Sequence, residues 1–283
     1  MARTASGTER LSAYSAFASA AIAVLATVTA MVSAFAAINA SNRIAEVQQH
    51  NAARAEISNY VVEMGQYDQD GGSIYRNEIA TLAKQVDTLI NIYGQDSLNL
   101  SPSAYRLTGL YTSLSTAELE LAASMERRAL SLATKRVPDG SGGTRMADPF
   151  EALQSHRVLA DIAAQNLDLT KMVKEYEAAL HISATEGDQS RYIGVEASRY
   201  TRAYRALSAM MLVDNRPPTS AQCAMVRKFA FESVEDFKYL GKENPELARR
   251  ALRIKDNACQ VPVDLEPLKK AAFQVGRSLA VGG

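Results

Sequence analysis

Apolar residues are unevenly distributed along this chain, and the longest stretch without charge lies near the N-terminus. Residues 11–42, between Arg10 and Arg43, include no Asp, Glu, Lys, Arg or His. A helix that crosses a membrane needs about 20 consecutive, mostly apolar residues. The apolar region of a cleaved signal peptide is shorter, at about 7–15 residues. The pattern therefore predicts a short tail over 1–10 and an uncleaved, single-pass signal-anchor helix over 11–42.

The helical pattern continues beyond this stretch, but with more polar residues. A thin row of apolar positions runs through 43–70, and polar residues interrupt it too often for a coiled coil. Gly71 and Gly72 then break the helix, because paired glycines have low helix propensity and permit a turn. We therefore expect a helical stalk over 43–70 and a separate domain over 71–283.

Within 71–283, apolar residues recur at helical spacing, and signals for helix starts lie between the apolar runs. No segment alternates with period 2, so no sheet is expected. The glycine-rich segment 135–147 is the longest loop and the best candidate for flexibility. Later helices are expected over 188–213, 219–240 and 245–258. The helix starts are Ser101-Pro102, Ser115 with Glu118, Asp148-Pro149, Asp168, Thr219, Asn244-Pro245 and Asp264.

These signals predict an all-α protein with about nine helices after the stalk. Most of the connections are short, and a short connection between two helices makes them antiparallel neighbours. The expected architecture is therefore an array of antiparallel helical hairpins. An irregular helical domain and a closed four-helix sensor bundle are the alternatives.

Three of the predicted helices share a spacing of small and aromatic residues. The shared spacing resembles that of the second helix of the tetratricopeptide repeat, which also packs against a neighbouring hairpin. The resemblance implies a helical-repeat array over roughly 101–245. The three instances start at 122, 172 and 233, farther apart than the repeat's usual length of about 34 residues. They are Ala122, Glu126 and Ala129; Met172, Tyr176 and Ala179; and Ser233, Phe237 and Leu240.

Composition and motifs argue against several classes of function. Lys plus Arg and Asp plus Glu both total 31, and such a balance does not favour nucleic-acid binding. His50, His156 and His181 have no ligand-type residue at metal-site spacing. Gly140, Gly142 and Gly143 resemble a linker, since no strand precedes them and no phosphate-binding Lys follows. We therefore predict no catalytic activity, no metal and no cofactor.

The two cysteines, Cys223 and Cys259, lie on consecutive predicted helices. In an antiparallel hairpin they are offset by roughly 7 Å along the axis, close enough for a small register shift to allow a disulfide. Two separately buried thiols are the alternative. A disulfide requires an oxidising compartment. Together with the short basic N-terminus, this favours an extracytoplasmic domain on a membrane anchor.

One predicted helix carries four arginines on one face. Arg191, Arg199, Arg202 and Arg205 fall within an arc of about 120°, and Tyr192 and Tyr200 flank that arc. Arginine and tyrosine are enriched at protein interfaces, so this face is a candidate site for an anionic partner or an acidic peptide. Alternatively, the arginines are solvated or paired with acidic residues nearby.

The favoured function is a membrane-anchored interaction or scaffold module that holds an unidentified protein partner and has no chemistry of its own. The alternative is a sensor domain that binds a small ligand and signals through a partner subunit. Nothing in the chain indicates nucleic acid as a partner, and the oligomeric state is left open.

Overall fold

The computed structural model describes residues 7–69, 74–113, 118–186, 193–215, 217–240, 245–254, 258–261, 263–266 and 268–269. Its side chains are described from Thr29 onward, apart from those of Pro245 and Glu246. The chain divides into two compact units, Met1–Glu56 and Ile57–Gly283.

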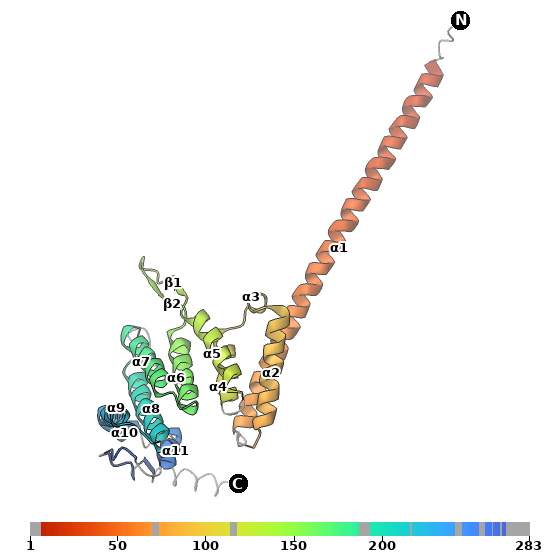
Figure 1. The fold of residues 1–283 in the computed structure, drawn as a ribbon. Helices are drawn as coiled ribbons and strands as arrows, with labels where there is room; N and C mark the ends of the chain where they lie inside the picture. Colours follow the sequence, from red (N-terminus) through yellow and green to blue (C-terminus); the bar gives the residue numbers. More distant parts are fainter. Residues whose placement is uncertain are drawn as a thin grey trace, which may run out of the picture. The chain divides into compact units, whose positions relative to one another are not determined.

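Eleven helices and two short strands occur in this described part of the chain (Figure 1). The prediction of a predominantly α-helical protein is confirmed. The helices are α1 (Gly7–Gln69), α2 (Arg76–Tyr93), α3 (Gln95–Leu98), α4 (Pro102–Ser113), α5 (Leu119–Ala133), α6 (Pro149–Gln165), α7 (Leu169–Thr185), α8 (Val195–Asp214), α9 (Ser220–Glu232), α10 (Val234–Leu240) and α11 (Pro245–Arg253). The strands are β1 (Arg136–Pro138) and β2 (Thr144–Met146).

The structure corrects the prediction of a membrane-spanning segment over 11–42. Among the described residues, no helix is both long enough and apolar enough to cross a membrane. Only 29–42 of the predicted span have described side chains, and this stretch is shorter than the roughly 20 residues that crossing requires. The side chains of 11–28 lie outside the described residues. The single-pass, signal-anchor and extracytoplasmic assignments rested on the span, so they are corrected with it.

The two strands form a hairpin inside the segment that was expected to be a loop, so the prediction of no sheet was wrong. β1 and β2 pair antiparallel, with Arg136 opposite Met146. In the turn, Asp139 Oδ1 accepts hydrogen bonds from the backbone N–H groups of Ser141 and Gly143, at 2.8 and 3.0 Å. Strands of three residues are too short to show the period-2 alternation on which the sequence prediction relied.

The second unit begins within the predicted stalk. Ile57, Val61 and Met64 are buried and lie one turn apart, on one face of the C-terminal part of α1. Gly65 lies on the same part of the helix, where an added Cβ would be 3.0 Å from the hydroxyl oxygen of Tyr111 on α4. A larger residue at position 65 would therefore require the Tyr111 side chain to shift by a few tenths of an ångström.

From α4 to α9, each helix packs on the next one (Figure 1). In addition, α4 contacts α6, and α6 contacts α8. Local signals position these helices as expected. Asp148 and Asp168 each cap a helix by accepting a backbone hydrogen bond, from Glu151 N and Lys171 N. Ser115, which was predicted to open α5, lies outside the described residues.

Three predicted helix boundaries differ from the structure. The helix predicted over 188–213 begins at Val195 in the described part, and 187–192 lie outside it. The helix predicted over 219–240 is divided into α9 and α10 at Ser233, whose hydroxyl donates to the carbonyl of Arg202 on α8. The helix α11 ends at Arg253, earlier than predicted.

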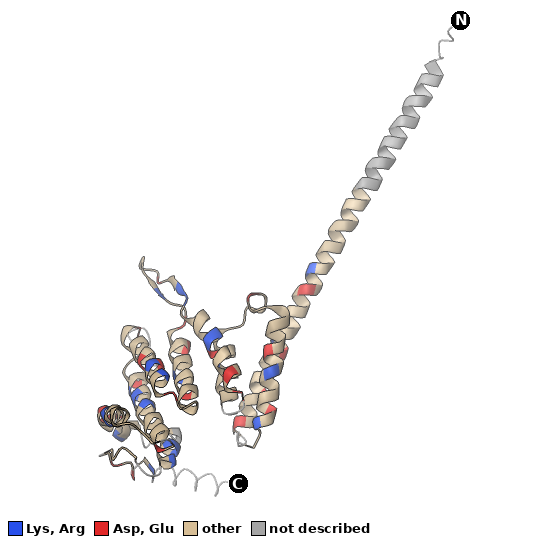
Figure 2. Ribbon diagram, viewed as in Figure 1, with Lys and Arg blue, Asp and Glu red and all other residues tan. Residues whose placement is uncertain are grey.

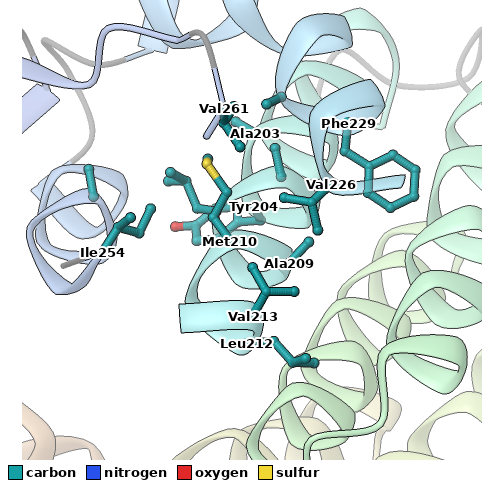
Figure 3. Close-up of a cluster of buried hydrophobic side chains, with 14 of the residues drawn as sticks. Ala203, Tyr204, Ala209, Met210, Leu212, Val213, Val226, Phe229, Ile254 and Val261 are labelled. Carbon is teal, nitrogen blue, oxygen red and sulfur yellow. The ribbon is translucent and has the colours of Figure 1, made fainter. Parts of the chain in front are cut away.

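The helix α8 is the centre of the second unit. It contacts α6, α7, α9, α10 and α11. Between Ala203 and Met210 every residue of α8 is buried, as expected for a helix enclosed on all sides. Figure 3 shows its apolar side chains meeting Val226 and Phe229 of α9, together with Ile254 and Val261 farther along the chain. The side chains of α8 that are not fully buried are thereby held on a rigid support.

Candidate functional site

Three arginines of α8 form a row that faces α9 and α10. Arg202 makes a two-point ion pair with Asp236, with distances of 2.7 and 3.0 Å from its Nε and Nη2 atoms. Arg205 Nη2 donates to Glu232 at 2.6 Å. Arg199 stacks on the ring of Tyr239, with its guanidinium carbon 4.2 Å from the ring centre. We call these three residues the arginine row.

The partners of the row show how the helices run. As the arginine number rises from 199 to 205, the partner number falls from 239 to 232. The helix α8 therefore runs antiparallel to the α9–α10 segment. Because successive arginines are three residues apart, they lie on one side of α8 and meet successive turns of its neighbours.

Arg205 is the buried member of the row, whereas Arg202 and Arg199 are half-buried. The side chain of Arg205 is 6 % exposed and lies over the ring of Phe229 at 4.1 Å, and burial lowers its pKa. The side chain of Arg202 is 33 % exposed, and its hydrogen bond to Asp236 raises its pKa. Arg199 is half-buried and lies at the end of the row that we call its open end, where its contact is with the Tyr239 ring.

Apolar surface surrounds this open end. Val195, one turn before Arg199 on α8, is 73 % exposed, and Tyr239 is 52 % exposed. Neither side chain belongs to the buried core clusters of this unit. Arginine and tyrosine, which meet here as Arg199 and Tyr239, are enriched in the residues that dominate binding at interfaces.

The structure divides the predicted arginine face. Arg199, Arg202 and Arg205 lie together, but Arg202 and Arg205 are used for packing within the chain. Tyr200 packs partly buried against the main core cluster. Arg191 and Tyr192 lie outside the described residues. The sequence did not show that Asp236 and Glu232 neutralise two of the arginines, since these acids lie on later helices.

A second polar cluster, centred on Asp161, joins four helices. Arg250 of α11 donates to both carboxylate oxygens of Asp161 on α6, at 2.8 and 2.7 Å. The Tyr176 hydroxyl of α7 donates to Asp161 at 2.6 Å, and Ser208 of α8 accepts from Arg250 at 2.9 Å. Arg250 and Arg157 each place their guanidinium carbon 4.5 Å from the ring centre of Tyr204.

The charges in the Asp161 cluster support one another. Burial acts to raise the pKa of Asp161, but the neighbouring Arg250 guanidinium outweighs it and lowers that pKa. Burial and the Asp161 carboxylate raise the pKa of Tyr176, so the phenol keeps its proton. Because every member of the cluster has a partner, we interpret it as a structural tie.

Glu126 is the least expected polar residue of the core. Its side chain on α5 is completely buried, and neither carboxylate oxygen has a hydrogen-bond partner among the described residues. Burial raises its pKa to about 9, although the Arg106 guanidinium acts in the opposite direction. It faces Gly109 of α4, where an added Cβ would be 2.6 Å from Glu126 Oε1. The carboxyl group is therefore neutral at pH 7.

Among the described residues, no cluster of His, Cys, Asp and Glu has the arrangement of a metal site. His156 Nδ1 lies 2.7 Å from Glu175 Oε2, which links α6 to α7. His181 lies exposed on α7, and His50 belongs to the first unit.

Cys223 and Cys259 form a disulfide, with sulfur atoms 2.07 Å apart and Cα atoms 5.0 Å apart. The bridge ties α9 to the segment that follows α11. Arg227 Nε strengthens the same junction by donating to the Cys259 carbonyl at 2.8 Å. Both cysteines are buried within the core cluster around α8, which indicates a structural tie.

Basic and acidic residues are interspersed over the helices of the second unit and do not gather by sign (Figure 2). A candidate charged site in this unit is therefore a small group of neighbouring residues and not an extended patch of one sign. The arginine row is the best defined of these groups.

Comparison with known proteins gives no relative: no family model, curated protein or solved structure matches this chain. The predicted resemblance to the tetratricopeptide repeat is corrected by this result, since no repeat family is detected. The structure explains why the spacing resembles that of the repeat. All nine residues of the shared spacing are buried, so the spacing follows the inward faces of packed helices in general.

Proposed function

We propose that the helical unit from Ile57 onward is a protein-interaction module without catalytic activity of its own. Its working surface is the open end of the arginine row, formed by Val195, Arg199 and Tyr239. The observation that carries the proposal is an arginine of α8 that stacks on Tyr239 of α10, with both Tyr239 and Val195 of α8 exposed. Arginine and tyrosine on a rigid support are the residue types that dominate binding energy at interfaces.

The chemistry of the other polar groups supports an interaction module over an enzyme. The Asp161 cluster is internally neutralised, and Glu126 on α5 is completely buried and faces α4. A catalytic acid or base must come within hydrogen-bond reach of a substrate. Neither group offers such access, whereas the open end of the arginine row does.

Site-specific photo-cross-linking in cells that make the full chain tests this proposal. A photoreactive amino acid at position 195 should yield a discrete adduct with another protein. The same amino acid at Ile92, which is 66 % exposed on α2, serves as the matched control and should not yield that adduct. Absence of an adduct at position 195, or the same adduct from both positions, would contradict the proposal.

A further inference from the structure

The arginine row has a regular pattern that its last member breaks. Arg205 and Arg202 each hold a carboxylate from the neighbouring segment, Glu232 and Asp236. The next turn of that segment presents Tyr239 to Arg199, so the ring supplies a face for stacking but no negative charge. Within the described part of the chain, no carboxylate pairs with Arg199, although both arginines before it in the row have one.

The Tyr239 ring prepares Arg199 for a ligand. A guanidinium group that lies flat on an aromatic ring keeps its N–H donors at its edge, directed away from the ring. Those donors match the two oxygens of a carboxylate in a two-point arrangement. Stacking also limits the side-chain freedom that would otherwise be lost when a ligand binds.

Val195 adds an apolar contact at a defined distance. It lies four residues before Arg199, about one helical turn or 5–6 Å along α8. Its side chain is 73 % exposed, so a partner can cover it. A matching partner carries an acidic side chain and an apolar side chain with the same separation, as two residues four positions apart on a helix do.

Building on the proposed function, we propose that Arg199 is the recognition residue of this surface and binds a glutamate or aspartate of a helical partner segment. The partner carboxylate completes the arginine row, in the role that Asp236 and Glu232 have for the other two arginines. An apolar residue one turn away on the partner covers Val195. Tyr239 positions Arg199 through the stacking contact.

The test uses the full chain and a capped, alanine-based helical peptide that carries Leu and Glu four positions apart. Binding is followed by the fluorescence anisotropy of a label on the peptide. We expect saturable binding that weakens about tenfold or more for Arg199→Gln, because a charge-assisted hydrogen bond is lost. Higher salt should weaken the wild-type complex as well.

Two controls keep the outcome specific. Arg145→Gln removes the same charge from the exposed β2 strand and should leave the affinity unchanged. A peptide with glutamine in place of the glutamate should bind wild-type protein as weakly as the original peptide binds Arg199→Gln. That comparison uses unaltered protein and so does not depend on how the variant folds. Equal binding of the two peptides, equal loss in both variants or no binding at all would overturn the inference.

The two proposals can fail separately. An adduct at position 195 in cells, without a preference of the isolated chain for the acidic peptide, would leave the interaction module standing and remove the role of Arg199. A carboxylate preference that depends on Arg199, without any cellular adduct, would leave the binding site standing and remove the proposed function.

Discussion

The guanidinium group of Arg250 binds both carboxylate oxygens of Asp161, at 2.8 and 2.7 Å, across 89 positions of sequence. This contact attaches α11 to α6 and covers the polar end of Tyr176 within the core. The side chains of Arg250 and Asp161 are 16 % and 24 % exposed, so solvent screens the pair only in part. The C-terminal part of the fold is thus held by a pair whose loss leaves a charge in a largely buried place.

Arg250→Gln should therefore destabilise the chain by about 3 kcal/mol, because the Asp161 carboxylate would lose its compensating charge. Urea denaturation of the full chain measures the loss. Arg253→Gln is the matched control, since Arg253 lies exposed in the last turn of the same helix and should change stability by less than about 0.5 kcal/mol. Equal effects of both substitutions would show that the ion pair contributes nothing beyond general charge.

Glu126 predicts a dependence of stability on pH. Its folded-state pKa, about 9, lies above the ordinary value of 4.5, so the folded chain holds a proton that the unfolded chain releases between these values. Stability should fall as the pH rises from about 4.5 to 9, and should be independent of this group above and below that window. At pH 7 the cost is on the order of 3 kcal/mol.

Glu126→Gln replaces the titrating carboxyl group with an amide that does not titrate and has nearly the same shape. The variant should be more stable than wild type at pH 7 and should lose the decline between pH 5 and 9, as measured by urea denaturation at a series of pH values. Glu120→Gln, on the exposed side of the same helix, should keep the wild-type slope. A wild-type slope in Glu126→Gln would show that another group is responsible.

Local sequence signals predicted local structure well, because the groups involved are neighbours in the chain. Asp148 and Asp168 cap their helices through backbone groups three residues away. The helical spacing of apolar residues matches the buried face of α2, with Ile79, Val86 and Ile90. Each of these relationships involves residues of a single helix or of its cap, so it can be read from neighbouring positions in the sequence.

Long-range relationships could not be read in the same way. Nothing near Arg202 in the sequence indicates that Asp236 will meet it 34 positions later. Glu126 is followed directly by Arg127 and Arg128, as a surface residue could be, and only the close approach of Gly109 reveals that α4 covers it. Of the candidate site, the sequence indicated the arginines but not which of them would remain open to a partner.

Gly109 should be intolerant of any larger residue. An alanine in an exposed helix interior usually stabilises relative to glycine by about 1 kcal/mol. At position 109, however, the new Cβ would lie 2.6 Å from Glu126 Oε1 and 3.0 Å from the Ala122 carbonyl oxygen. Gly109→Ala should instead destabilise by about 1–3 kcal/mol in urea denaturation, as overpacking does.

A double substitution separates the two clashes at Gly109. Glu126→Ala removes the side chain but not the Ala122 carbonyl, so it should relieve only part of the cost of Gly109→Ala. The two substitutions should therefore be non-additive, with a coupling of at least about 0.5 kcal/mol. Strict additivity would place the cost of Gly109→Ala in the backbone contact alone.

The disulfide between Cys223 and Cys259 should make stability sensitive to reductant. The bond closes a loop with a sequence separation of 36 residues, and restricting the unfolded chain by such a loop stabilises by about 3–4 kcal/mol. Thermal unfolding of the full chain with and without a thiol reductant measures the difference. The double variant Cys223→Ser with Cys259→Ser should match the reduced wild type and show no response to reductant, because these are the chain's two cysteines. A reductant effect of the same size in the variant would place the sensitivity outside the disulfide.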